Sequence, residues 1–292
     1  MATWSSLLRS GWLWALPWLL SAGASASAAD RYDIQQAIEY ARQGDESLKA
    51  DIYVPRGQGP FPGVLVVHGG AWLVGNRARI AWHAEQLAEH GYTAVAINYR
   101  LAPRHPFPAQ LEDCQAALCF MRDNAQKHKI DADRLGGYGY SAGGHLVALV
   151  GTMGPDDRLQ KPAVADKIPP RLRAVVAGGA PCNFCMMPPA NPRLAYWLGG
   201  TRAECPQAYE LASPLQFVTS DDPPMFFFHG EADRLVPIAT VKAMVAKLES
   251  VGVPASLHTV SEGGHVATYR DQEAMAASIG FLDRYLKDRK PK

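Results

Sequence analysis

The sequence of 292 residues is 48% hydrophobic, 9% aromatic and 20% charged, a composition typical of a folded globular chain and not of a disordered one. The 29 Lys and Arg residues face 28 Asp and Glu residues, which gives a formal net charge of +1. Nucleic acids and anionic membranes attract proteins with clustered positive charge. The balanced composition therefore predicts neither a nucleic acid nor an anionic membrane as a partner.

Residues 1–29 have the features of an export signal. Arg9 precedes an apolar stretch over Gly11–Leu20, and small residues follow, ending in Ala26-Ser27-Ala28. A stretch of about ten apolar residues is short against the roughly 20 that a membrane-spanning helix needs, and the small-x-small pattern suits signal peptidase. We predict a signal peptide over 1–28, a mature domain over 29–292, export to the periplasm or the medium, and no stable membrane insertion after cleavage. An uncleaved membrane anchor is the alternative.

Five cysteines in an exported chain raise the question of disulfide bonds. Cys114 and Cys119 are expected on different faces of one helix, too far apart to be bridged, and are predicted to be buried thiols. Cys182, Cys185 and Cys205 lie in one irregular region. These three could form one disulfide with one thiol left over, or remain unreactive thiols. Tetrahedral zinc needs about four ligands, and since too few lie nearby we expect no metal site.

Short apolar runs alternate with helical patterns from residue 64 onward. Strands are predicted over 64–67, 93–97, a segment ending near Tyr140, 174–177, 225–228 and 256–260, and helices over 79–90, around 111–121, from Gly143, over 238–251 and around 275–286. Strands alternating with helices imply parallel βαβ units. The predicted fold class is α/β, with a mostly parallel twisted sheet and helices on both faces. The stretches 152–170 and 180–222 lack a clear period and are predicted to leave the sheet, the second forming a small irregular cap over the site.

The first candidate for chemistry is Gly139-Tyr140-Ser141-Ala142-Gly143-Gly144, at a strand-to-helix junction. A nucleophilic hydroxyl must project from a tight turn, and the glycines two residues to each side leave room for that turn. The N–H groups at the start of the following helix point towards a developing oxyanion. We therefore predict Ser141 as a nucleophile and the Ala142 N–H as an oxyanion donor. A glycine-rich turn with a capping serine is the alternative.

A second motif, His68-Gly69-Gly70-Ala71-Trp72, follows the strand over 64–67. Small residues let the backbone approach a substrate, and the N–H groups of Gly70 and Ala71 are predicted to complete the oxyanion hole. His68 itself is expected to shape the turn through a hydrogen bond to the backbone.

A serine hydroxyl needs a neighbouring base, and the base needs an anion that orients it. His265 follows the last predicted strand, and Asp233 lies four residues beyond the strand that ends near His229. The order Ser141, Asp233, His265 is the order used by the α/β-hydrolase fold. The competing carboxylates, predicted to be solvated loop residues, are Glu231, Glu262 and Asp222. The remaining histidines are assigned to a strand interior (His258) or to helix surfaces and loops (His83, His90, His105 and His128).

On these residues the sequence resembles the esterase/lipase branch of the α/β-hydrolase superfamily, which includes acetylxylan- and feruloyl-esterase-like proteins and hormone-sensitive-lipase-like carboxylesterases. The resemblance spans about 64–270 and also covers Tyr99-Arg-Leu-Ala-Pro103, a structural loop beneath the site in such families. The hormone-sensitive-lipase pattern has a third glycine where this chain has Ala71, and an Asp-Pro-Leu acid where it has Asp233-Arg-Leu. These departures point to the feruloyl/acetylxylan or short-chain side of the branch.

The resemblance implies a serine hydrolase that cleaves short-chain, acetyl or aromatic carboxylic esters through an acyl-enzyme, without a metal or cofactor. The substrate would be a small molecule or an ester linked to a polysaccharide. An arylformamidase-like amidase and a catalytically inactive binding protein built on the same fold are the alternatives. Pocket shape, which depends on 180–222, sets the acyl preference; Met186, Met187, Tyr196 and Trp197 are either pocket or core residues. The oligomeric state stays open.

Overall fold

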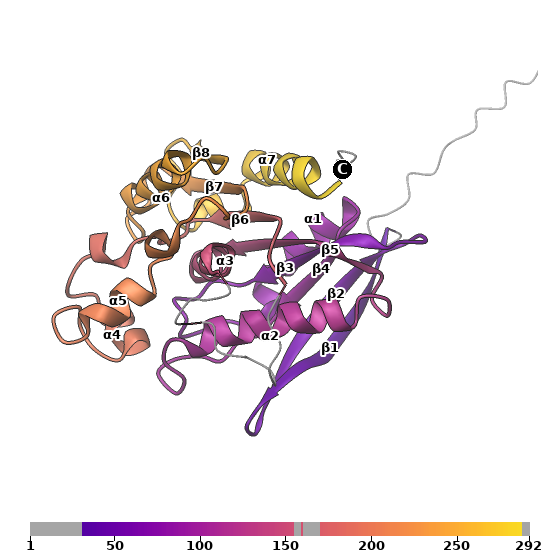
Figure 1. Cartoon of the computed structure of the whole chain (residues 1–292), viewed down its shortest axis with the longest axis horizontal. Coiled ribbons are helices and arrows are strands. Elements are labelled where there is room, and N and C mark those ends of the chain that lie inside the picture. Colours follow the sequence, from indigo (N-terminus) through magenta and orange to yellow (C-terminus); the bar gives the residue numbers. More distant parts are fainter. Residues whose placement is uncertain (1–30, 155–158, 160–169, 288–292) are drawn as a thin grey trace, which may run out of the picture.

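The computed structural model describes residues 31–154, 159 and 170–287 (Figure 1). The predicted signal peptide over 1–28 lies outside the described residues.

The described chain forms an eight-stranded sheet in the order β1-β2-β4-β3-β5-β6-β7-β8. Neighbouring strands from β4 to β8 pair in parallel, whereas β2 pairs antiparallel with both β1 and β4. The strands are β1 (Tyr32–Gln43), β2 (Glu46–Pro55), β3 (Phe61–Val67), β4 (Thr93–Ile97), β5 (Ile130–Tyr140), β6 (Ala174–Gly178), β7 (Met225–Gly230) and β8 (Ala255–Val260). The predicted α/β class with a mostly parallel sheet is confirmed.

The hairpin of β1 and β2 is absent from the sequence prediction. The sequence feature that indicates this hairpin is an apolar residue at every second position of β2. These residues, Leu48, Ala50, Ile52 and Val54, are all buried. Alternation of period two marks a strand with one buried face. In β2 the pattern is blurred because Asp51 and Tyr53, between the apolar residues, are buried as well.

Helices cover both faces of the sheet, as predicted (Figure 1). Apolar residues of α1 (Ala81–Glu89) and α7 (Gln272–Leu282) pack on one face, with Val64 and Val66 of β3. Residues of α2 (Ala109–Asp123), α3 (Ala142–Thr152) and α6 (Ile238–Ser250) pack on the other, with Leu65 and Val67. Because successive side chains of a strand point to opposite faces, one continuous apolar run fills both layers.

The region predicted as an irregular cap contains two short helices, α4 (Pro192–Leu198) and α5 (Pro206–Leu211). The side chain of Asn191 caps α4 by accepting hydrogen bonds from the backbone N–H groups of Arg193 and Leu194, and Gly199 ends the helix with a φ of 84°. Asn as an N-cap and Gly in the left-handed region are the common helix boundaries. The cap therefore contains more regular structure than was predicted from its sequence, which has no clear hydrophobic periodicity.

None of Cys182, Cys185 and Cys205 is in a disulfide bond. A disulfide among Cys182, Cys185 and Cys205 is therefore wrong, and the alternative of free thiols holds. Cys114 and Cys119 are buried, as predicted. Within the described ranges no group of three or more His, Cys, Asp and Glu side chains could hold a metal ion, and no helix is long and apolar enough to cross a membrane.

Three polar residues predicted at the surface are buried instead. His83 and His128 have no exposed surface, and Asp222 is 7% exposed. Each has a hydrogen-bond partner that compensates its burial: the ring of His83 contacts the Tyr269 carbonyl at 2.7 Å, that of His128 contacts the Gln35 side chain at 2.8 Å, and Asp222 accepts hydrogen bonds from Thr219.

Candidate active site

Ser141 occupies a strained turn between β5 and α3. Its φ of 57° and ψ of −120° are unusual for a residue with a side chain. A Cβ at Gly139 would lie 2.3 Å from the Gly143 carbonyl oxygen, and one at Gly143 would lie 2.0 Å from that of Val67. Only glycine fits at either position, which is the reason for the Gly-x-Ser-x-Gly spacing.

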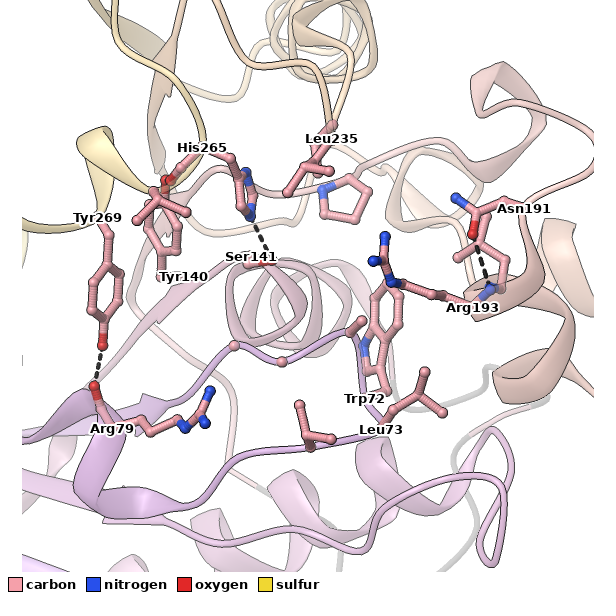
Figure 2. Close-up of a pocket in the computed structure, with 18 of the residues that line it drawn as sticks. Trp72, Leu73, Arg79, Tyr140, Ser141, Asn191, Arg193, Leu235, His265 and Tyr269 are labelled. Atoms are coloured by element: carbon pink, nitrogen blue, oxygen red, sulfur yellow. Dashed lines mark hydrogen bonds between the residues drawn. The ribbon is translucent and has the colours of Figure 1, made fainter.

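The structure brings together the three residues predicted from distant parts of the chain. Nε2 of His265 lies 2.9 Å from Oγ of Ser141, and Nδ1 of His265 lies 2.6 Å from Oδ2 of Asp233. Figure 2 shows the contact between the imidazole and the hydroxyl at the wall of a pocket. The three side chains follow β5, β7 and β8, so they meet because parallel strands end at one edge of the sheet.

The carboxylate of Asp233 is fixed and ionised. Its Oδ1 accepts hydrogen bonds from the N–H groups of Leu235 at 2.8 Å and Val236 at 2.9 Å. Burial favours the neutral acid, but the hydrogen bonds with His265 and these N–H groups outweigh it and lower the pKa of Asp233. The site therefore holds a negative charge against the imidazole.

His229 is a second histidine at this carboxylate, and sequence reasoning gave it no role. Its Nε2 lies 2.9 Å from the Val236 carbonyl oxygen and 3.3 Å from Oδ2 of Asp233. Burial lowers the pKa of His229, so the ring is neutral at pH 7. With its proton on Nε2, the ring donates to the Val236 carbonyl and steadies the turn that carries Asp233. The sequence feature that could have indicated this role is the position of His229 at the end of a strand, four residues before Asp233.

The two loops that carry the acid and the base pack directly against each other. A Cβ at Gly230 would lie 2.0 Å from the Gly263 carbonyl oxygen, which also accepts a hydrogen bond from the Ala232 N–H at 3.0 Å. The hydroxyl of Tyr140, next to the serine, donates to the His265 carbonyl. The base is therefore tied to both the acid loop and the nucleophile turn.

The predicted oxyanion loop touches the nucleophile. A Cβ at Gly69 would lie 3.1 Å from Cβ of Ser141. Gly70 and Ala71 line the same pocket as Ser141 and have positive φ values of 129° and 52°. Ala142 is the first residue of α3, where backbone N–H groups have no partner within the helix. The segments predicted to supply oxyanion donors therefore lie around one hydroxyl.

His68 shapes this loop, as expected. It is fully buried, its Nδ1 lies 2.7 Å from the Gly69 carbonyl oxygen, and its ring stacks on Tyr99 at 4.2 Å. Burial lowers the pKa of His68 to about 4, so the ring is neutral at pH 7. The hydroxyl of Tyr99 donates to the His68 carbonyl at 3.0 Å. The segment that begins at Tyr99 thus supports the loop from below, in agreement with the resemblance.

His145 is a further residue whose role sequence reasoning missed. From α3 its Nδ1 accepts a hydrogen bond from Nε1 of Trp72 at 3.2 Å, and its Nε2 donates to the Ala212 carbonyl at 2.7 Å. Trp72 in turn stacks on Trp197 of α4 at 3.8 Å. This chain of contacts joins the oxyanion loop, the nucleophile helix and the cap. The sequence feature that could have indicated this role is the presence of a histidine in an otherwise apolar helix.

The site opens into a cavity of about 700 Å³ that lies beside Ser141 and His265 (Figure 2). Its lining includes Trp72, Leu73 and Leu235, which make much of the wall apolar. Four cap residues were predicted to belong either to the pocket or to the core. Of these, Met187 lines the cavity and Trp197 is a core residue. Met186 and Tyr196 are exposed and do not line it.

The structure gives no hydrogen bond or ion pair between the competing carboxylates and the imidazole of His265. Glu231 and Glu262 are exposed, as predicted, and Asp222 is bound to Thr219 at 3.0 Å. None of the three lines the cavity. Among the candidates, Asp233 is the one in contact with His265.

A doubly covered, mostly parallel sheet with serine, acid and histidine at its carboxyl edge defines an α/β-hydrolase. The family model BD-FAE matches residues 50–248, and the chain belongs to this family, in the esterase branch of the superfamily.

The curated relatives include bacterial esterases. Esterase LipC of Mycobacterium tuberculosis is 31% identical over 66% of this chain and 49% of its own length. Esterase LipQ of the same organism is 30% identical over 86% of this chain and 63% of its own length. The chain thus spans about half to two thirds of the length of these relatives.

Solved structures match nearly the whole described fold. A truncated carbohydrate esterase from gut microbiota has a TM-score of 0.77 and 25% identity, over 88% of this chain and 98% of that one. An esterase of Thermogutta terrifontis with bound propionate has a TM-score of 0.74 at 24% identity, over 87% of this chain and 96% of that one, a likeness of fold.

Proposed function

We propose that this chain hydrolyses carboxylic esters, with Ser141 as nucleophile, His265 as base and acid, and Asp233 as the anion that orients the imidazole. The observation that carries this proposal is the unbroken line of contacts from Asp233 through His265 to Ser141, at 2.6 Å and 2.9 Å, at the wall of a cavity. A hydroxyl this close to an imidazole nitrogen is placed for proton transfer as it attacks a carbonyl carbon.

In the first step Oγ of Ser141 bonds to the ester carbonyl carbon while its proton passes to Nε2 of His265. The negative charge then forms on the carbonyl oxygen, where the N–H groups of Gly70, Ala71 and Ala142 would stabilise it by about 3 kcal/mol each. As the tetrahedral intermediate collapses, His265 gives its proton to the leaving alcohol. An acyl group remains on the serine.

In the second step a water molecule gives a proton to His265 and attacks the acyl carbon, and the serine leaves with the proton from the imidazole. Throughout, Asp233 keeps Nδ1 of His265 protonated and stabilises the imidazolium that forms. The low pKa of this carboxyl group keeps it charged as the imidazole gains its proton.

We further propose that short-chain, acetyl or aromatic acyl groups are preferred, on small molecules or on polysaccharides. Met187 and Leu194 of the cap line the cavity, and a cavity of about 700 Å³ suits a small ester. The likeness to a carbohydrate esterase supports the polysaccharide-linked alternative.

The test is a panel of p-nitrophenyl esters of increasing acyl length, with acetylated xylan, methyl ferulate and a formylated aromatic amine, run on the wild type and on Ser141→Ala. We expect turnover to peak at short acyl chains and to fall at least about 10⁴-fold in the variant, because the nucleophile is lost. An unaltered rate in Ser141→Ala would overturn the mechanism. Preferred cleavage of the formamide would show the amidase alternative, and no turnover of any compound would show the inactive binding protein.

The signal peptide over 1–28 and export of the mature chain remain proposals. They rest on the sequence pattern of residues 1–29 alone. Sequencing the amino terminus of the protein recovered outside the cytoplasm should begin near Ala29. Recovery of the intact amino terminus in membranes would support an anchor instead.

A further inference from the structure

The charged residues that line the cavity are of one sign. Arg79, Arg193 and Arg270 line it, and its lining includes neither Asp nor Glu. The whole chain is balanced, with 29 basic and 28 acidic residues, whereas the lining has three arginines, all of them exposed, and no acidic residue. In a mostly apolar cavity, positive charge that lacks a counterion favours an anionic occupant.

Arg270 already has interactions outside the cavity. Its guanidinium carbon lies 5.9 Å from the ring centre of Trp82. It also acts on Glu85, where it opposes the rise in pKa that burial causes. Of the three arginines it is therefore the one whose charge is partly balanced by the protein.

Arg79 and Arg193 are in a different position. Neither makes an ion pair or a side-chain hydrogen bond among the described residues. Figure 2 shows their side chains reaching into the pocket from opposite sides, Arg79 beside Tyr269 and Arg193 above Trp72. Both residues are exposed and line the same cavity as Ser141.

The backbone that carries each of these arginines is held in place. The Arg79 carbonyl accepts a hydrogen bond from the hydroxyl of Tyr269, and the Arg193 N–H donates to the Asn191 side chain at 3.1 Å. Two unpaired guanidinium groups on anchored backbone can bind an oxyanion without a rearrangement of the chain. Arginine offers paired N–H groups that match a carboxylate in geometry as well as in charge.

We propose that the pocket takes esters that carry a carboxylate group, bound by Arg79, by Arg193 or by both. The inference rests on the proposed function, since it specifies the substrate class of the same site. The carboxylate takes no part in bond making or breaking; it fixes the body of the substrate in the apolar cavity while the ester carbonyl meets Ser141. The two arginines on opposite walls allow the carboxylate to be on the acyl side or on the alcohol side of the ester.

Matched pairs of substrates separate these two possibilities. On the acyl side, the monoethyl esters of succinic and adipic acid are compared with ethyl butyrate and ethyl hexanoate, with hydrolysis followed by proton release. On the alcohol side, 4-acetoxybenzoate is compared with 4-acetoxybenzamide, with hydrolysis followed by release of the phenol. The readout is the ratio of kcat/KM for the charged compound to that for its neutral partner, which cancels any general change in the enzyme.

The variants are Arg79→Gln, Arg193→Gln and the double variant, each of which keeps a hydrogen-bonding side chain. The matched control is Arg173→Gln, which removes the same charge from an exposed residue just before β6, at the end of the sheet opposite Ser141. We expect a charged-to-neutral ratio of about ten or more for one substrate side in the wild type, since each charge-assisted hydrogen bond is worth about tenfold. The ratio should fall towards one in the double variant and stay unchanged in Arg173→Gln.

The loss should appear mainly as a higher KM for the charged ester, because the carboxylate is bound equally in the ground and transition states. A wild-type ratio below one for both sides, or a ratio that the double variant leaves unchanged, would overturn the inference. If the neutral esters are hydrolysed in a way that depends on Ser141 while this ratio fails, the proposed function stands and only the substrate class is wrong.

Discussion

At the scale of single residues, Asp233 is the member of the site most firmly held by its surroundings. It contacts His265 at 2.6 Å and receives two backbone N–H groups from its own turn. The pKa of the carboxyl group is lowered, so it keeps its charge well into acid. An anion fixed in this way can hold one tautomer of an imidazole.

Replacing Asp233 by Asn tests whether that charge matters. The amide keeps the size of the side chain but removes the anion and permits the wrong tautomer of His265, so kcat should fall by about 10⁴-fold. Ester hydrolysis by the purified variant gives the answer, and circular dichroism checks that it folds.

The exposed neighbours supply the controls for that variant. Glu231→Gln and Glu262→Gln should keep the wild-type rate, because neither carboxylate lines the cavity. A large loss of activity in either variant, with Asp233→Asn still active, would assign the acid to another residue.

The sequence allowed Ser141, Asp233 and His265 to be predicted because each follows a readable strand and because the order of the three is informative. His145 and His229 could not be found in this way, since their partners are main-chain carbonyls that only the folded chain brings near. Arg79 and Arg193 were missed for a related reason: their residue type says nothing until both face one cavity.

At the scale of elements, the turn between β5 and α3 depends on glycine at Gly143. A Cβ there would lie 2.0 Å from the Val67 carbonyl oxygen, and since β3 is central in the sheet, it cannot move away freely. We predict that Gly143→Ala lowers the free energy of unfolding by at least about 3 kcal/mol, the upper range for overpacking in a core. Urea unfolding followed by tryptophan fluorescence measures this change.

Gly264→Ala is the matched control, on the loop next to His265. Nothing lies within 4 Å of a Cβ at Gly264. Its free energy of unfolding should therefore stay within about 0.5 kcal/mol of the wild-type value. Equal stability of the two alanine variants would contradict the close packing described for the nucleophile turn.

The elements themselves were predictable where one pattern dominates. The parallel strands β3, β4, β6 and β7 are mostly continuous apolar runs, and Gly91 and Gly252 follow α1 and α6 within two residues. The antiparallel hairpin of β1 and β2 was missed because its apolar positions are interleaved with Asp51 and Tyr53, which are buried by contacts made elsewhere in the fold. The cap helices α4 and α5 are only 7 and 6 residues long, too short for a helical period to appear.

At the scale of the whole molecule, three buried histidines make stability depend on pH. Burial lowers the pKa of His68 and of His83 to about 4 and that of His145 to about 3, from the ordinary value of 6.5. Below pH 6.5 the unfolded chain binds protons at these rings while the folded chain does not. Stability is therefore complete above pH 6.5 and declines as the pH falls towards 4.

Each of these histidines should cost about 2 kcal/mol of stability at pH 5 relative to pH 7.5. Urea unfolding at the two pH values measures the total, and the difference for His83→Gln, whose amide can still donate to the Tyr269 carbonyl, should be smaller than that of the wild type by about 2 kcal/mol. An equal free energy of unfolding at pH 7.5 and pH 5 would mean that these rings are not held neutral.

The central claim is that the hydroxyl of Ser141 is activated by the folded molecule as a whole. A fluorophosphonate probe followed by peptide mass mapping tests this directly, because such probes phosphonylate activated serines. We expect about one label per chain, on the peptide that contains Ser141, with slow labelling in His265→Ala and none after unfolding in urea. Folded wild-type protein that stays unlabelled, or that carries its label on another residue, would contradict it.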